Sequence, residues 1–150
     1  MTNCKKFRKV ERCLFHYRVN KSRLEQIRAE LEELQKAGDV HAQDYTGRMK
    51  TSANNADPVS SYVHKVLTLE HRISVLERYT APITQLLDDL QHSSDSMSRH
   101  YQQILKLFYF GGLTVSGVLE ITRWNRNTFY SRRHSLISLA ADYLLIKDNQ

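Results

Sequence analysis

Residues 59–90 read VSSYVHKVLTLEHRISVLERYTAPITQLLDDL, and this stretch decides the fold class. Its mostly apolar seam positions alternate in steps of three and four, the spacing that lines one side of a long helix. The seam is formed by Val59, Tyr62, Val66, Leu69, Ile73, Leu76, Thr80, Ile83, Leu87 and Leu90. The pattern predicts a long amphipathic helix. Because Pro82 removes a backbone hydrogen bond and crowds the preceding turn, we expect a kink or short break near residues 78–81.

A second long helix with the same kind of seam is predicted from about Cys4 to Ala37. Its seam is formed by Val10, Cys13, Tyr17, Asn20, Leu24, Ile27, Leu31 and Leu34, with Phe7 and Leu14 beside it. Gly38 follows at the position of a helix C-cap. Residues 38–58 are small, polar and turn-forming, which predicts a flexible loop. Two long helices joined by one loop most simply form an antiparallel hairpin.

Three more helices are predicted in the C-terminal third of the chain. Thr114 and Asn125 stand at N-cap positions of the second and third of them. Their expected ranges are about 96–110, 115–122 and 126–146, the first ending at Gly111-Gly112. Gly 5 and Pro 2 in 150 residues are few for a chain of many tight turns. We therefore predict an all-α protein with a long antiparallel helical hairpin at 1–92 and a helix-turn-helix bundle at 93–150.

The charge of the chain points to a polyanionic partner. There are 22 Lys and Arg against 16 Asp and Glu, a net charge of +6. Between residues 99 and 134 the sole acidic residue is Glu120, against six Arg and Lys. This clustering suits nucleic acid, and a solvated positive face is the alternative. The basic run Lys5, Lys6, Arg8, Lys9 and Arg12 has the same two interpretations, a solvated helix face or a second nucleic-acid contact.

Segment 115–134 has the layout of a helix-turn-helix, with a short helix, a tight turn and a longer second helix. Val118, Leu119, Trp124 and Phe129 are predicted to pack the two helices together. With Phe129 inward, a step of 100° per residue turns the neighbouring polar side chains outward. The residues predicted to contact DNA are Arg123, Asn125, Arg126, Asn127, Thr128, Tyr130, Ser131, Arg132, Arg133 and His134.

The chemistry of this set suits a DNA duplex. Arg126 and Asn127 can pair with guanine and adenine edges in the major groove. Arg123, Arg132 and Arg133 are expected to contact phosphates, which position a protein on the duplex without reading its sequence.

Residues 112–121 (GLTVSGVLEI) and 124–131 (WNRNTFYS) resemble the C-terminal helix-turn-helix of phage late-transcription regulators of the ArpU/RinA type. That unit is in turn similar to the promoter-reading end of bacterial sigma factors. The resemblance implies a sequence-specific transcriptional regulator, an activator of phage or mobile-element genes, that acts on double-stranded DNA and RNA polymerase in the cytoplasm of a bacterial host. The chain departs from the pattern at Leu119, Arg123 and Arg132, where small or apolar residues are usual. Arg132 is expected to cover the core with its stem and keep its head in water.

Two other functions remain open from the sequence. One is a viral DNA-packaging component that binds DNA as an oligomer. The other is a protein-interaction factor that acts on a repressor or on RNA polymerase through residues 126–134. A homo-oligomer formed through the heptad helices is compatible with each of the three.

Other chemistry finds little support in the residues. The seven histidines and two cysteines lack the short spacings of zinc sites, so no metal is expected. Asp88 and Asp89 point about 100° apart on a helix, which is unsuited to a shared catalytic site. No phosphate-binding Gly loop or nucleophile elbow occurs, and no apolar stretch reaches the length of a membrane span. We expect neither an enzyme nor a cofactor, and a cytoplasmic protein without membrane contact.

Overall fold

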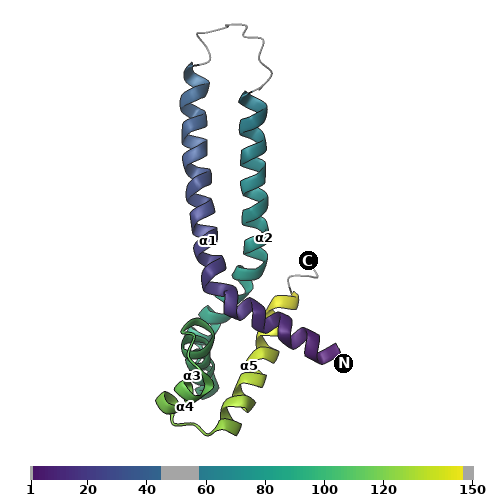
Figure 1. The fold of residues 1–150 in the computed structure, drawn as a ribbon, viewed down its shortest axis with the longest axis vertical. Coiled ribbons are helices and arrows are strands. Elements are labelled where there is room, and N and C mark those ends of the chain that lie inside the picture. The colour runs from purple at the N-terminus through teal and green to yellow at the C-terminus, as the bar shows by residue number, and fades with distance from the viewer. Residues whose placement is uncertain (1, 45–57, 147–150) are drawn as a thin grey trace. The chain divides into compact units, whose positions relative to one another are not determined.

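The computed structural model describes residues 2–44 and 58–146, and within these ranges the protein is helical without strands (Figure 1). The predicted all-α class is confirmed. The elements in chain order are α1 (Thr2–Asp44), α2 (Pro58–His92), α3 (Ser96–Ile104), the π-helical segment η2 (Leu105–Phe110), α4 (Val115–Thr122) and α5 (Arg126–Ile146). None of these helices is both long enough and apolar enough to cross a membrane.

The described residues form two compact units. The hairpin unit lies between Lys21 and Glu77, and the core unit combines the residues up to Asn20 with those from Arg78 onward. This division differs from the expected one at residue 92. The start of the first hairpin helix and the end of the second both pack with the C-terminal helices. The amino-terminal turns of α1 and the end of α2 therefore belong to the same unit as α4 and α5.

The hairpin unit is antiparallel, as the sequence predicts. Arg28 of α1 pairs with Glu77 of α2, whereas Gly38, ten residues further along α1, lies against Tyr62. Figure 1 shows the two helices side by side here. The ion pair is largely exposed and contributes little, so the buried seam residues Leu24 and Leu69 hold the unit together.

Helix α1 does not end at Gly38, and the predicted C-cap is wrong. The helix continues to Asp44, so residues 39–44 of the expected loop are helical. Gly38 instead lies inside the helix, where an added Cβ would stand 2.6 Å from two carbons of the Tyr62 ring. The absence of a side chain lets α2 approach closely at this point. The rest of the expected loop, residues 45–57, lies outside the described residues.

Helix α2 has no break at Pro82, contrary to one of the two expected outcomes. It runs without interruption from Pro58 to His92. Near this point the hydroxyl of Thr84 donates to the carbonyl of Thr80 at 3.0 Å and also meets the hydroxyl of Tyr17 at 2.9 Å. Pro82 is fully buried in the core unit, so its packing compensates for the missing backbone donor.

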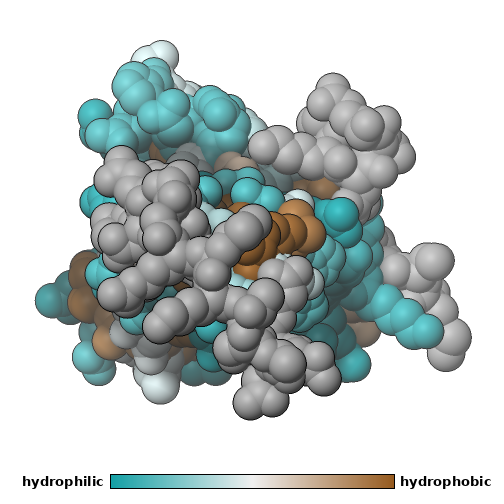
Figure 2. Space-filling view, turned by 90° about the horizontal axis from the view of Figure 1, so that it is seen from above, coloured by the Kyte–Doolittle hydropathy of each residue, from teal (hydrophilic) through white to brown (hydrophobic). Residues whose placement is uncertain are grey.

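The seam residues of the two long helices pack mainly inside the protein. Most seam positions on both long helices are buried or half-buried. Large apolar side chains of α2 that remain exposed are Val59, which belongs to the seam, and Val63, Leu67, Val75 and Tyr79, which do not. Figure 2 likewise shows hydrophobic atoms at the surface between hydrophilic ones. An oligomer through the buried seam would have to open the hairpin, whereas one through the exposed side chains would not.

The core unit is built around fully buried side chains from each of its helices. They include Leu14, Ile83, Leu86, Ile104, Leu105, Val118, Phe129, Leu136 and Ile137. The predicted helix at 96–110 is α-helical only to Ile104, and Leu105–Phe110 is a π-helix. Leu105 and Tyr109 of this segment are buried. At its end the Leu113 amide donates to the Leu107 carbonyl at 3.1 Å, with Gly112 at a φ of 68°.

Candidate nucleic-acid interface

Helices α4 and α5 begin at the capping residues that the sequence predicts. The Thr114 hydroxyl accepts a hydrogen bond from the Gly117 amide at 3.2 Å. The Asn125 side-chain oxygen accepts one from the Thr128 amide at 2.7 Å. Each cap satisfies an amide that the helix itself leaves without a partner, so the first turn forms at a defined residue. The three residues 123–125 between the helices make the turn.

The packing between the two helices also agrees with the prediction. Val118 of α4 and Phe129 of α5 are fully buried. The Phe129 ring meets the Phe108 ring of η2 edge to face, with ring centroids 5.5 Å apart. These contacts determine how α4 crosses α5 and hold the start of α5 against the rest of the unit.

Arg123 is the residue that makes the turn, and its backbone is strained. It has a φ of 61° and a ψ of 21°, the left-handed conformation that glycine adopts most easily. Its amide donates to the Leu119 carbonyl at 2.9 Å and closes α4. The side chain is exposed beside the start of α5. Because arginine is strained in this conformation and glycine is not, we infer that the Arg123 side chain has a role at the surface.

Arg132 packs against Trp124, a residue of the turn. Its guanidinium lies over the Trp124 ring, 4.4 Å from the centroid, and the His100 ring meets the same indole edge-on at 5.2 Å. Its Nη1 atom is buried without a hydrogen-bond partner among the described residues. The expectation that the head of Arg132 stays in water is thus wrong, because a planar cation is attracted to the face of an indole. We assign Arg132 to the support of the turn instead of to phosphate contacts.

Arg133 is likewise engaged inside the unit. Its guanidinium forms an ion pair with Glu11 of α1, and its Nε lies 2.9 Å from Glu11 Oε1 and 3.3 Å from the Tyr109 hydroxyl. Tyr109 itself donates to Glu11 at 2.9 Å. Burial alone would lower the pKa of Arg133, but the hydrogen bonds to Glu11 and Tyr109 outweigh burial and raise it. Burial raises the pKa of Tyr109. Arg133 therefore stays charged and ties α1 to α5.

Glu11 is the residue of this site that the sequence analysis missed. It is the single acidic residue among the first 24, standing in a run of cations. Its isolation was a usable signal. Which cation this lone acid meets depends on tertiary packing alone.

The first two turns of α5 present an uncovered polar surface. We call Arg126, Asn127, Tyr130 and Ser131 the reading face; these four residues are exposed, Tyr130 to 43%. Asn125 and Arg123 are exposed beside it, whereas Thr128 is half-buried. His134 is exposed too, and its ring stacks on Phe7 of α1, with centroids 5.7 Å apart. The structure thus brings most of the predicted residues together and turns Arg132 and Arg133 inward.

The reading face carries side chains that can form hydrogen bonds with base edges. It offers one guanidinium, one carboxamide and two hydroxyls, and it contains no carboxylate. The acid nearest to it along the sequence, Glu120, is on α4. Within the ranges 2–44 and 58–146, no group of three or more His, Cys, Asp or Glu side chains is placed to hold a metal ion. In comparisons with protein-family models, curated proteins and solved structures, nothing matched this chain.

Proposed function

We propose that this protein binds double-stranded DNA sequence-specifically by placing the start of α5 in the major groove, and that it regulates transcription. One observation carries the proposal: the first two turns of α5 are uncovered while Phe129, in the same turns, is fully buried. A helix held rigidly on one side and open on the other meets the geometric requirement of a recognition helix.

The proposed contacts divide by role. Arg126 and Asn127 read base edges, since a guanidinium pairs with guanine O6 and N7 and a carboxamide with adenine N6 and N7. Tyr130 and Ser131 can bond a phosphate or a base edge through their hydroxyls. Arg123 contacts a phosphate at the start of α5. Arg132 and Arg133 act indirectly, because they hold the turn and α1 in place.

The regulatory part of the proposal rests on the resemblance of residues 112–131 to phage late-transcription regulators. On that basis the protein is an activator that acts with RNA polymerase in a bacterial cytoplasm. A defined ring-shaped oligomer in solution would favour the packaging role instead. Weak, sequence-blind DNA affinity that vanishes near physiological salt would favour a protein-interaction factor.

The Arg126→Ala/Asn127→Ala double variant tests the base contacts. Each substitution is expected to weaken specific binding by about 1–3 kcal/mol and to relax base preference at one position. The measurement is a selection from randomised duplexes at about 0.15 M salt, a concentration at which charge attraction alone is weak. Titration of the selected duplex then gives the affinities.

The matched control is Arg72→Ala/Gln91→Ala, which removes one guanidinium and one carboxamide from exposed positions of α2. It should bind like the unaltered protein. An unchanged selected sequence in Arg126→Ala/Asn127→Ala would remove both residues from the reading face.

The Arg123→Gly variant distinguishes a role of Arg123 in DNA binding from a role in stability. Glycine adopts the left-handed conformation freely, so the free energy of unfolding is expected to rise by roughly 1 kcal/mol. Loss of one phosphate contact should lower the magnitude of the log–log salt slope of binding by about 0.9, with base preference unchanged. Arg123→Asn, which also tolerates this backbone, should behave alike. A fall in stability in both variants would make the Arg123 side chain structural instead.

A further inference from the structure

The first turns of α1 carry a surface of exposed cations. Lys5, Lys6, Arg8, Lys9 and Arg12 are all exposed. No ion pair joins any of them to another described residue. Glu11, the acid among them, points inward to Arg133 with its side chain only 15% exposed. The fold thus removes the single negative charge from this surface.

The same turns of α1 lie across α5, just beyond the reading face. Phe7 stacks on His134 and lies 5.7 Å from the Arg133 guanidinium, and Glu11 pairs with Arg133. Val10 lines a hollow with Ile137 and Ala141, which lie further along α5. The Glu11 side of α1 therefore faces the start of α5, and the Val10 side faces its later turns. Figure 1 shows the amino-terminal end of α1 crossing α5.

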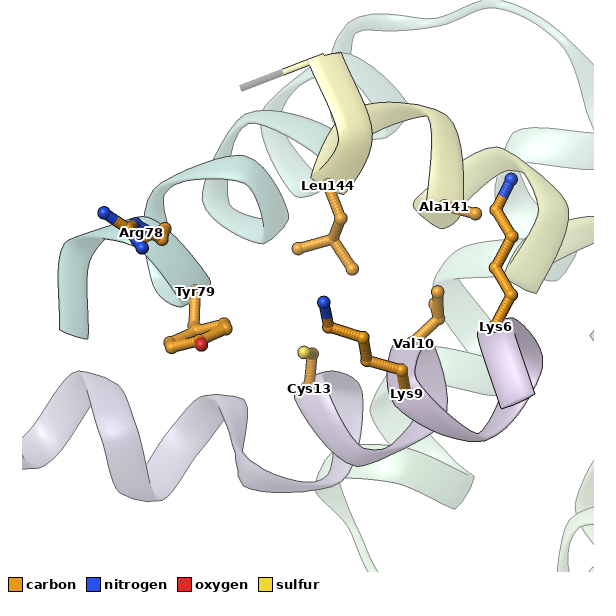
Figure 3. Close-up of a pocket in the computed structure, with 8 residues that line it drawn as sticks. All are labelled: Lys6, Lys9, Val10, Cys13, Arg78, Tyr79, Ala141 and Leu144. Carbon is orange, nitrogen blue, oxygen red and sulfur yellow. The ribbon is translucent and has the colours of Figure 1, made fainter. Parts of the chain in front are cut away.

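This order places Arg8 and Arg12 on the half of α1 nearer the reading face and Lys6 and Lys9 on the other half, with Arg12 and Lys9 about 60° apart where the two halves meet. With 100° per residue, Arg8 lies about 60° and Arg12 about 100° beyond Glu11, on the flank nearer the reading face. Lys6 and Lys9 lie about 40° and 100° beyond Val10, on the other flank. Lys6 and Lys9 line a hollow of ≈ 150 Å³ together with Ala141 and Leu144. Figure 3 shows these side chains around the hollow.

We propose that Arg8 and Arg12 contact phosphates of the same DNA duplex that α5 reads, so that α1 is a second backbone-binding element. This inference rests on the proposed function. Since α1 crosses α5 next to the reading face, a duplex on the first turns of α5 would approach the side of α1 that carries these two arginines. The ion pair between Glu11 and Arg133, joined by Tyr109, fixes α1 to α5, so little ordering is needed on binding. Contacts of this kind add affinity and register without reading bases.

The test compares two double variants that remove equal charge: Arg8→Gln/Arg12→Gln and Lys6→Gln/Lys9→Gln. The full chain is titrated with its selected duplex between about 0.05 and 0.3 M salt. Losing two phosphate contacts should lower the magnitude of the log–log slope by about 1.8 and weaken binding roughly 30-fold at about 0.15 M salt. The selected sequence should stay the same. The lysine pair should change binding less than about 3-fold, the residual effect of net charge on association.

The outcomes separate the two proposals. Equal losses in both variants would show diffuse attraction by net charge and would overturn the assignment to one flank. No loss in the arginine variant, with a selected sequence for the unaltered protein, would overturn this inference and leave the proposed function standing. If the unaltered protein selects no sequence at all, the proposed function fails and this inference fails with it. Circular dichroism on heating should show both variants folded, since the four side chains are exposed.

Discussion

Phe129→Ala is expected to destabilise the core unit by about 3–5 kcal/mol, the range for truncating a fully buried Phe. The ring is fully buried between α4 and η2, where Val118 and Phe108 are neighbours in the same core. Its removal leaves a cavity at the crossing of α4 and α5. Since small domains are stable by about 5–15 kcal/mol, the loss is a large part of the total. Urea unfolding followed by circular dichroism measures it.

DNA binding should fall with stability in Phe129→Ala, because the crossing that presents the reading face is lost. The control is Ile121→Ala, which truncates an apolar side chain of α4 that is 60% exposed. We expect it to change the free energy of unfolding by about 0.5 kcal/mol or less. An unfolding midpoint in Phe129→Ala that matches the Ile121→Ala control would mean that the two helices are held together elsewhere.

Glu11→Ala is the second large effect that we expect, a loss of about 3 kcal/mol of stability, at the lower end of the range for breaking a buried ion pair. The side chains of Glu11 and Arg133 are 15% and 20% exposed, so the guanidinium is left largely without solvent when its partner is removed. Tyr109 also loses the acceptor of its hydroxyl. The measurement is again unfolding in urea.

A double-mutant cycle isolates the pair. Adding Arg133→Met, which retains an apolar stem, should recover part of the stability that Glu11→Ala loses, since the uncompensated charge is gone. Glu25→Ala, an exposed acid further along α1, is the control and should be nearly neutral. Simple additivity of the two substitutions would show that Glu11 and Arg133 do not act as a pair in solution.

Local patterns predicted the helices of the C-terminal third almost to the residue. Thr114 and Asn125 start α4 and α5, and Gly112 closes the segment before them, because caps and left-handed glycines act through hydrogen bonds to neighbours in sequence. The same reasoning was wrong at Gly38. A glycine after an apolar stripe looks the same whether it ends a helix or admits a side chain from another helix, here Tyr62.

In the candidate site, too, some features follow from local sequence and others only from tertiary packing. The exposed side chains of the reading face follow from the inward position of Phe129 and the helical period alone. The inward turn of Arg132 and Arg133 does not, because it depends on Trp124 and on Glu11, the latter 122 residues away from Arg133. The π-helical turns of η2 were also beyond sequence periodicity, since the apolar spacing of residues 96–110 is that of an ordinary α-helix.

Sequence by itself thus determined the helical class, the caps and the composition of the uncovered face, all of which depend on residues within about two turns of one another. The tertiary structure alone decided which cations remain at the surface and which are held inside. Burial of a charge requires a partner and the removal of water, and only the folded arrangement of α1, η2 and α5 provides both.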